Sequence, residues 1–434
     1  MTLLVISPDY ASHLLPLATL ATAWRDAGES VVVATGPATD AIVREFGLER
    51  YDLPLGRGSN ARVIRAEDQP EEESDSLRGF FDATRRGMVP TLSYQARERL
   101  TDLMWDPVDA ARRTLAAVEA VAPDAIIVDH LAFSARLALQ TAGIPYADVV
   151  LGHPSALPVA GEVYGYPPFW PAAFSPGGGE LAELRALCDE VSARFTAEWN
   201  RTARTLDAYA RPTADAFGEH GDLVLYNYPA ALAEGDGRML PPHAFLGSTR
   251  RVEATDDQVE EWLDATGDFA YVSFGSFLSV RRDVLRRIAQ ALAQIGMPAA
   301  IAAGSTPPES LGPIPDGWLV REYLPQVRLL SAARLAVTHG GNNSVTEAIG
   351  QGVPLLVLPF STDQFAGAAA IERTGFGRAL DPNGATVEDL AAGLTAVSDL
   401  AAMPSLRSLA RDQAGRPGPQ IAYELLNARE PATS

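Results

Sequence analysis

Short apolar runs alternate with longer amphipathic segments along the whole chain. The apolar runs occupy residues 3–7, 30–35, 124–129, 145–151, 222–227, 269–275, 298–304, 318–324, 334–339, 354–360 and 377–381. The segments between them, such as 14–28 and 131–143, carry apolar residues at helical spacing. Strands that alternate with helices are typical of parallel sheets with helical crossovers, so the pattern predicts an α/β protein.

The chain has 434 residues, which is longer than a single hydrophobic core usually supports. We therefore expect two doubly wound domains, an N-terminal one over residues 1–235 and a C-terminal one over 258–415. The segment 236–257 is rich in Gly, Pro and charge and is interpreted as the linker. A Gly-Arg-Pro-Gly-Pro break precedes a last helix within 416–434, which we expect to pack back on the N-terminal domain.

Two stretches lack a clear period. Residues 55–100 contain the acidic run 66–75 and are interpreted as a solvated loop. Residues 152–180 are rich in Pro and Gly and are predicted to be irregular, which in a stretch of this length is typical of functional or mobile loops. This second stretch suits either a wall over an apolar ligand or simple packing on the domain surface. Its aromatic residues are Tyr164, Tyr166, Phe169, Trp170 and Phe174.

Composition excludes several classes of partner. The net charge of −20 argues against nucleic acid or an anionic membrane, because both require basic surface. Cys188 is the only cysteine, so it is predicted to be a packing residue and not part of a multi-cysteine metal site. The N-terminus lacks the basic start of a secretion signal, and no apolar run approaches the roughly 20 residues of a membrane span. We expect a soluble, cytoplasmic protein.

The strongest chemical signal is a strand, a glycine turn and a helix in the second half of the chain. The predicted strand ends at His339, Gly340 and Gly341 follow, and a helix begins at Asn343–Ser344. This arrangement gathers unpaired backbone N–H groups and the positive end of a helix dipole at one point. His339, Asn343 and Ser344 can add side-chain hydrogen bonds. The turn is therefore predicted to bind an anion such as a diphosphate.

Further polar residues follow on the same edge of the predicted sheet. Glu347 lies one helical turn beyond Asn343, where its carboxylate can accept from a ribose hydroxyl. Asp363 and Gln364 follow the next strand, and ligands of open α/β sheets bind at this edge. Paired acceptor and donor side chains suit sugar hydroxyls.

These residues resemble the signature of the family 1 glycosyltransferases, which runs His-x-Gly-x-Asn-Ser-x-x-Glu, then Gly-x-Pro, then Asp-Gln. The matching positions are His339, Gly341, Asn343, Ser344, Glu347, Gly352, Pro354, Asp363 and Gln364. The resemblance implies the GT-B fold, in which two Rossmann-like domains face each other across a cleft. It also implies that the C-terminal domain binds a nucleotide sugar.

Other elements of the same family recur nearby. Tyr323 and Gln326 match an aromatic-x-Pro-Gln element whose aromatic residue, often Trp, stacks on the nucleobase. Gly275 and Ser276 match a turn beside the phosphates. Asn342 stands where plant members have Trp, so the resemblance leaves the donor sugar open.

The first turn after a strand adds a candidate base. His13 and Pro16 match the family's Gly-His-x-x-Pro, with Ser12 in place of the glycine. The resemblance implies that His13 is the general base, because a neutral imidazole can accept the proton of an attacking hydroxyl. Asp129, at the end of a predicted strand, is the candidate carboxylate that holds the far nitrogen of this imidazole. His130 either lines the acceptor site or is a helix cap or a surface residue.

The function that the resemblance implies is an inverting, metal-independent transfer of a sugar. The donor is a UDP- or dTDP-linked sugar, which is a co-substrate and not a cofactor, and no metal-ligand spacing occurs. The charge of the leaving diphosphate must then be balanced by the helix dipole, backbone amides and His339. Trp105, Phe80, Phe81 and the aromatic loop favour a small apolar acceptor, such as a natural product. Oligomeric state is not readable from the sequence.

Three rival functions share parts of this pattern. A dinucleotide-dependent dehydrogenase is disfavoured because the first turn lacks all glycines of Gly-x-Gly-x-x-Gly. A nucleotide-sugar epimerase of the same architecture stays open, although it would need no acceptor site. A non-catalytic auxiliary paralogue also stays open, although such a chain should have lost the base or the phosphate-binding residues.

Overall fold

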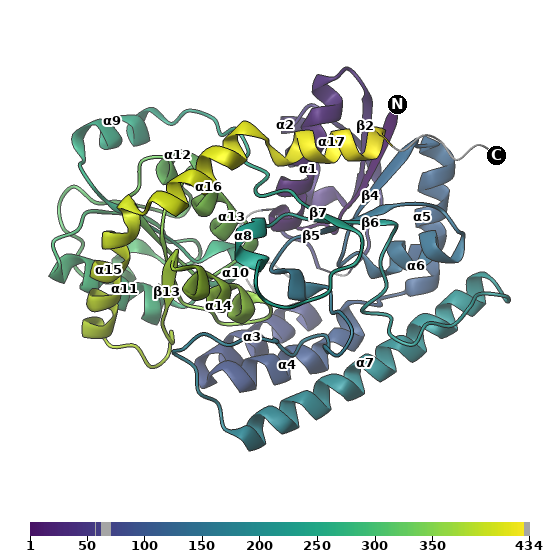
Figure 1. Ribbon diagram of the computed structural model, residues 1–434, viewed down its shortest axis with the longest axis horizontal. Coiled ribbons are helices and arrows are strands. Elements are labelled where there is room, and N and C mark those ends of the chain that lie inside the picture. Colours follow the sequence, from purple (N-terminus) through teal and green to yellow (C-terminus); the bar gives the residue numbers. More distant parts are fainter. Residues whose placement is uncertain (57, 62–70, 429–434) are drawn as a thin grey trace.

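The computed structural model describes residues 1–56, 58–61 and 71–428, without the side chains of 71–73 and 99–102. Two parallel β-sheets form separate α/β domains within this part of the chain (Figure 1). The first sheet has the strand order β3-β2-β1-β4-β5-β6-β7, and the second has the order β10-β9-β8-β11-β12-β13. All of their neighbouring strands run parallel, which confirms the predicted α/β class with two doubly wound domains.

The strands are short and mostly apolar. Those of the N-terminal sheet are β1 (Thr2–Ile6), β2 (Ser30–Thr35), β3 (Glu49–Asp52), β4 (Ala125–Asp129), β5 (Ala147–Val150), β6 (Leu223–Tyr226) and β7 (His243–Phe245). Those of the C-terminal sheet are β8 (Ala270–Ser273), β9 (Ala299–Ala302), β10 (Leu319–Arg321), β11 (Leu335–Thr338), β12 (Leu355–Val357) and β13 (Gly377–Ala379). Helices cover both faces of each sheet, so the central strands are buried from end to end, as in other parallel sheets.

The helices follow the strands in alternation. The N-terminal half contains α1 (Ala11–Asp26), α2 (Asp40–Glu45), α3 (Glu71–Arg86), α4 (Met88–Asp102), α5 (Pro107–Val121), α6 (Phe133–Thr141), α7 (Gly178–Leu206) and α8 (Ala230–Ala233). The C-terminal half contains α9 (Asp257–Ala265), α10 (Gly275–Leu278), α11 (Arg282–Gln294), α12 (Gln326–Leu330), α13 (Asn342–Gly350), α14 (Gln364–Thr374), α15 (Val387–Ser398), α16 (Pro404–Gly415) and α17 (Gly418–Asn427). Single 3-10 turns lie at Pro37–Thr39, Pro154–Ala156, Pro308–Leu311 and Asp399–Ala402.

Two edge strands of the N-terminal sheet escape the sequence pattern. Strand β3 has the sequence Glu-Arg-Tyr-Asp, and only one of its sides is paired, so it needs no apolar run. Strand β7 has three residues and lies inside the segment 236–257 that was interpreted as a linker. The sheet therefore extends into that segment before the chain enters the second domain.

The interpretation of residues 55–100 as a loop is wrong for most of that stretch. Helices α3 and α4 form a hairpin there, and α4 packs along the long helix α7 (Figure 1). Met88, Leu92 and Ala96 give α4 its buried side against α7. The acidic residues that suggested a loop begin α3, where carboxylates favour the helix dipole. Residues 66–70 of the acidic run lie outside the described residues.

The last helix crosses from one domain to the other. Helix α17 lies against α1 of the N-terminal domain, and α16 leads into it from the C-terminal domain (Figure 1). The ring of Tyr423 meets the ring of Trp24 edge-on at 5.2 Å between centroids. The Tyr423 hydroxyl also donates to the Glu29 carboxylate over 3.0 Å. Because α16 packs on α13 and α17 packs on α1, this part of the chain bridges the two domains.

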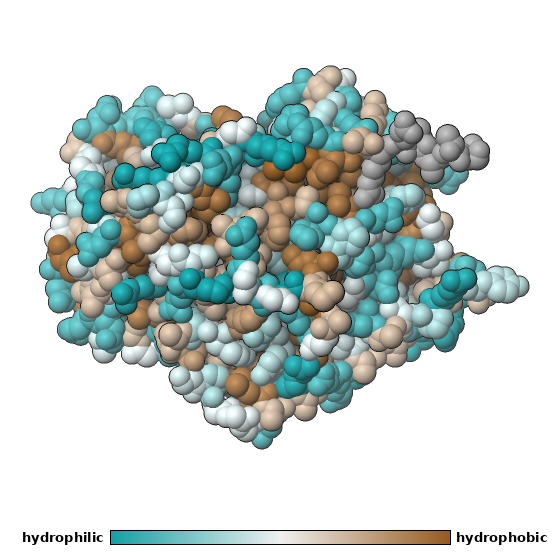
Figure 2. Space-filling model, viewed as in Figure 1, coloured by the Kyte–Doolittle hydropathy of each residue, from teal (hydrophilic) through white to brown (hydrophobic). Residues whose placement is uncertain are grey.

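The surface mixes hydrophilic and hydrophobic residues over the face seen in Figure 2. In the described part of the chain, no helix is both long and apolar enough to cross a membrane.

Candidate active site

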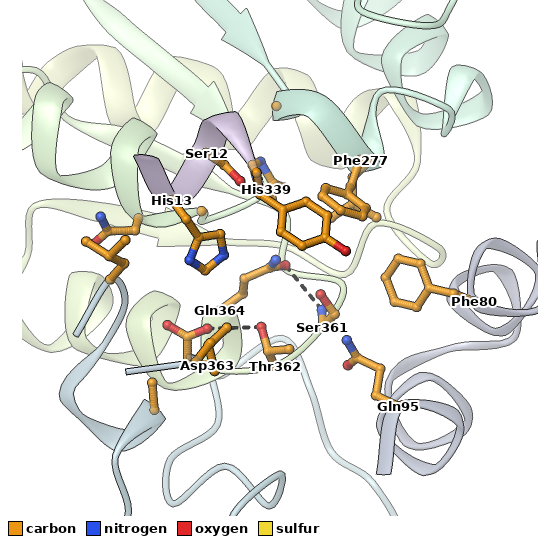
Figure 3. Close-up of a pocket in the computed structure, with 18 of the residues that line it drawn as sticks. Ser12, His13, Phe80, Gln95, Phe277, His339, Ser361, Thr362, Asp363 and Gln364 are labelled. Carbon is orange, nitrogen blue, oxygen red and sulfur yellow. Dashed lines mark hydrogen bonds between the residues drawn. The ribbon is translucent and has the colours of Figure 1, made fainter. Parts of the chain in front are cut away.

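A cavity of about 490 Å³ lies between the two domains. Its wall combines residues at the carboxyl ends of β1 and β4 with residues at the carboxyl ends of β8, β11 and β12. These are the ends at which ligands of open parallel sheets bind. Figure 3 shows the two contributions facing each other, with His13 on one side and His339, Asp363 and Gln364 around it.

Most of the site residues predicted from the sequence meet in this cavity. Those in its wall are His13, Gly275, Ser276, His339, Gly341, Asn342, Asn343, Ser344, Asp363 and Gln364. Asp129 lies directly behind His13. Tyr323, Gln326 and Glu347 lie outside the wall, in an adjacent group on the C-terminal domain.

The candidate base and its carboxylate are in direct contact. The Nδ1 atom of His13 lies 2.7 Å from Oδ2 of Asp129, which is fully buried. The other carboxylate oxygen accepts the backbone N–H of Leu131 over 2.9 Å. The carboxylate therefore accepts a hydrogen bond from the Nδ1–H group of a neutral imidazole, which leaves Nε2 as the proton acceptor.

The charges of this pair support each other. Burial works against both charged forms, but the Asp129 charge and its hydrogen bond raise the pKa of His13 above 6.5. Burial likewise disfavours the Asp129 carboxylate, yet His13 and the Leu131 amide hold the pKa of Asp129 below its usual value. A carboxylate that stays ionised beside an imidazole is suited to stabilise the imidazolium that forms when a base accepts a proton.

A second histidine touches the same carboxylate. His130 lies in the cavity wall, with Nδ1 3.5 Å from Oδ1 of Asp129 and 3.3 Å from the Val149 carbonyl. Burial lowers the pKa of His130 to about 4, although the Asp129 charge opposes the shift. The His130 side chain is therefore neutral at pH 7, so the Asp129 carboxylate is available to stabilise a positive charge on His13.

In the predicted anion-binding turn, the backbone at Gly275 and Gly341 packs closely against the His339 ring. Helix α13 begins after Gly341, and a Cβ at Gly341 would collide with the His339 imidazole. Gly275 has φ +64° and approaches the same ring, where a Cβ would lie 2.9 Å from Cε1. Both glycines are thus required by the closeness of the turn to His339. The first residues of α13 line the cavity, so the N–H groups that lack a helical partner lie at its wall.

His339 is neutral in this structure. Burial lowers its pKa to about 4, and a hydrogen bond with the Ser273 backbone opposes the shift only in part. The positive charge that the sequence led us to expect from His339 is therefore absent at pH 7 without a ligand. Its contact with a leaving diphosphate stays a prediction.

Asp363 and Gln364 already have partners within the protein. The Asp363 carboxylate accepts the backbone N–H of His153 over 2.7 Å, which joins the two domains. The Gln364 carbonyl accepts the backbone N–H groups of Phe360 and Ser361, at 3.0 and 3.2 Å. These bonds orient both side chains toward the cavity wall, and the Gln364 amide NH₂ is the group left for a ligand hydroxyl. Contact with a sugar stays a prediction.

The three residues outside the wall form one network. Gln326 donates to the Glu347 carboxylate over 2.6 Å, and its own carbonyl accepts from the Ser344 hydroxyl over 3.3 Å. Arg251, which the sequence argument did not identify, pairs with the other oxygen of Glu347. Tyr323 is 54% exposed beside this group, so its ring face is accessible for stacking. Ribose binding by Glu347 and base stacking by Tyr323 stay predictions.

The N-terminal side of the cavity holds residues that the sequence argument missed. Helices α3 and α4 contribute Ser76, Leu77, Phe80, Tyr94, Gln95 and Glu98. Of these residues, the sequence pattern points only to Phe80, as a sign of an apolar acceptor. Figure 3 places Phe80 and Gln95 on these helices, with Phe80 beside Phe277 of the other domain. The sequence signal for these two helices is the helical spacing of apolar residues within 74–98, which the neighbouring acidic run obscures.

The aromatic segment 152–180 serves partly as a wall of the cavity and partly as packing on the domain surface. Tyr164 and Tyr166 line the cavity. Trp170 and Phe174 instead pack on Phe365 of α14, with ring centroids 5.8 and 5.3 Å away. The segment is therefore part wall and part interdomain packing. Within the described residues, no group of three or more His, Cys, Asp or Glu side chains is arranged to hold a metal ion.

Comparison with solved structures places this architecture in a known fold class. The glycotransferase of kitacinnamycin superposes with a TM-score of 0.66 at 20% identity, over 99% of each chain. The spinosyn rhamnosyltransferase SpnG, solved with thymidine diphosphate, gives a TM-score of 0.61 at 19% identity, over 98% of this chain and 100% of that one. Two parallel-sheet domains with these neighbours define a GT-B protein.

Sequence comparison finds a family match in the second half of the chain. Residues 234–417 match the profile of the UDP-glucoronosyl and UDP-glucosyl transferases. Oleandomycin glycosyltransferase from Streptomyces antibioticus is 27% identical over 272 residues, which cover 58% of this chain and 62% of that protein. The aligned part thus spans less than two thirds of that relative. The C-terminal domain is thus similar to the UDP-glucoronosyl and UDP-glucosyl transferases.

Proposed function

We propose that the protein is an inverting, metal-independent glycosyltransferase that moves a sugar from a nucleoside diphosphate to an apolar small molecule. The observation that carries the proposal is the meeting of two half-sites in one cavity. His13, backed by Asp129, faces the turn of His339 and the start of α13. A base for the acceptor and an anion site for the leaving group are the two parts that such a transfer needs. Cytoplasmic location belongs to the same proposal.

The acceptor is activated at His13. Its Nε2 atom accepts the proton of the acceptor hydroxyl while Asp129 stabilises the resulting imidazolium. The acceptor oxygen forms a bond to the anomeric carbon as the bond from that carbon to the diphosphate oxygen breaks. Because the base and the anion site lie in opposite walls, the attack comes from the face opposite the diphosphate. The configuration inverts, so an α-linked donor yields a β-glycoside.

The leaving diphosphate is received by the C-terminal domain. The start of α13 supplies backbone N–H groups and the positive end of its dipole. His339 adds a neutral hydrogen-bond donor. In this proposal, these groups take over the charge stabilisation that a metal ion provides in other enzymes.

The chemistry of the cavity supports an apolar acceptor. Phe80 and Leu77 of α3, together with Tyr164 and Tyr166, give its N-terminal wall an apolar part beside the polar side chains of α3 and α4. Aromatic and aliphatic walls with few polar groups are typical of sites for apolar ligands. This wall is the observation against an epimerase, which needs no acceptor site. Thymidine diphosphate in the structurally similar SpnG supports testing dTDP sugars beside UDP sugars.

The experiment is a transfer assay with a polycyclic aromatic alcohol as acceptor. UDP-glucose and dTDP-glucose are supplied separately, with and without a chelator, and the anomeric configuration of the product is read by NMR. A β-glycoside whose yield does not depend on the chelator is the expected result. An α-glycoside would overturn inversion, loss of activity with chelator would overturn metal independence, and formation of an epimeric donor without acceptor would establish the rival function.

A further inference from the structure

Helix α1 contains a proline in its interior. Pro16 is the sixth residue of the helix, beyond the first turn in which proline is readily tolerated. At this position the backbone N–H of an ordinary residue would donate to the carbonyl of Ser12, four residues earlier. Proline has no N–H, so the Ser12 carbonyl lacks its helical donor. Ser12 directly precedes His13, the candidate base.

The hydrogen-bond donor to the Ser12 carbonyl comes from the other domain. The side-chain Nδ2 of Asn343 donates to the Ser12 carbonyl over 3.2 Å. Asn343 is the second residue of α13, and its own carbonyl accepts from the Asn342 amide over 3.3 Å. The bond therefore joins the first turn of α1, which carries His13, to the turn that forms the anion site. Both turns lie in the wall of the same cavity.

We propose that Pro16 and Asn343 act as a positioning pair across the domain interface. Pro16 keeps the Ser12 carbonyl free of the helix, and Asn343 uses that carbonyl to dock the His13 turn onto the start of α13. Neither residue transfers a proton. Their role is to fix the distance between the base and the leaving group, since a displacement of about 1 Å can cost roughly 100-fold in rate. The catalytic part of this inference rests on the proposed function, whereas the hydrogen bond does not.

The first test is thermal and needs no activity. Pro16→Ala restores a backbone N–H that can donate to Ser12 within the helix, so the carbonyl no longer depends on Asn343. Asn343→Ala in the native chain should lower Tm by about 1–3 °C, because it leaves a partly buried carbonyl without its donor. The same substitution in the Pro16→Ala chain should lower Tm by less than half as much. Equal shifts in both backgrounds would overturn the pairing.

The second test is kinetic. Pro16→Ala should leave Tm unchanged or higher, because it removes a residue that disfavours the helix interior. It should nevertheless lower kcat about 10-fold, with the nucleotide Kd and the KM for the donor unchanged. Thr22→Ala, on the same helix with a side chain bonded to the Thr19 carbonyl, is the matched control and should keep kcat.

The outcomes separate the two claims. A Pro16→Ala chain with native kcat would overturn the positioning role. A native chain that transfers no sugar would overturn the proposed function, and the Tm comparison would still decide whether Pro16 and Asn343 are coupled. A merely structural proline would change Tm and kcat in the same direction, whereas the positioning pair predicts a stable but slower enzyme.

Discussion

The two walls of the cavity are built from different kinds of structure. The C-terminal wall consists mainly of turns and a helix start, in which backbone groups and glycines approach His339 closely. The N-terminal wall consists mainly of side chains from α3, α4 and the aromatic segment around Tyr164. A wall made of backbone tolerates few substitutions, whereas a wall made of side chains can change with its ligand. This difference supports the proposed assignment of the nucleotide sugar to the C-terminal wall and of the acceptor to the N-terminal wall.

The largest expected effect is the loss of the base from the N-terminal wall. His13→Ala should lower the transfer rate by about 10²- to 10⁴-fold, which is the usual contribution of a positioned base. Nucleotide affinity should not change, because the anion site lies in the other domain. His243→Ala, at an exposed ring of the N-terminal sheet, is the matched control. A native transfer rate in His13→Ala would show that His13 is not the base.

The next effect concerns the carboxylate behind the base. Asp129→Asn should lower transfer about 10- to 10³-fold at pH 8. His13 works in its neutral form, so kcat/KM falls as pH drops through its pKa, which Asp129 raises above 6.5. Without that charge, burial lowers the pKa of the imidazole against only the weaker attraction of Asp363, and the acidic limb should move to lower pH. A pH–rate profile measures this shift, and an unmoved limb would contradict the pairing.

An intermediate effect is expected on the C-terminal wall. His339→Ala should weaken nucleoside diphosphate binding about 10- to 100-fold, because a hydrogen bond to a charged group contributes about 1.5–3 kcal/mol. His339→Asn keeps a donor and should recover part of the affinity. Because burial lowers the pKa of His339 to about 4, the imidazole stays neutral between pH 7 and 5, and the affinity ratio between the native chain and His339→Ala should not change over that range. Calorimetry at several pH values checks both points, and an affinity independent of residue 339 would refute the assignment.

The smallest effect separates the two walls most selectively. Phe80→Ala should raise the KM for an apolar acceptor about 3- to 10-fold, because an aromatic face is lost from the cavity. The nucleotide Kd should stay unchanged. Phe174→Ala removes an aromatic ring that packs on α14 outside the cavity, and it should leave the acceptor KM unchanged. A larger change in nucleotide affinity than in acceptor KM would place Phe80 on the donor side.

The contrast between the walls also explains what the sequence could reveal. The alternation of apolar runs predicted both sheets, and fixed glycines made the turn around His339 readable as an anion site. The partnership of His13 and Asp129, 116 positions apart, was reachable because both follow parallel strands of one sheet. The α3–α4 hairpin was hidden, because charged residues dominate its exposed face and its apolar contacts lie with α7. Arg251 beside Glu347 carries no local pattern at all, since it pairs across 96 positions.

The division of labour between the walls is tested most directly by calorimetric titration with UDP and with dTDP, without added metal. The native chain, His13→Ala and His339→Ala are compared under the same conditions. The account predicts micromolar binding of at least one nucleotide, unchanged in His13→Ala and weakened in His339→Ala. Binding of neither nucleotide to the native chain, or binding lost in His13→Ala and kept in His339→Ala, would contradict it.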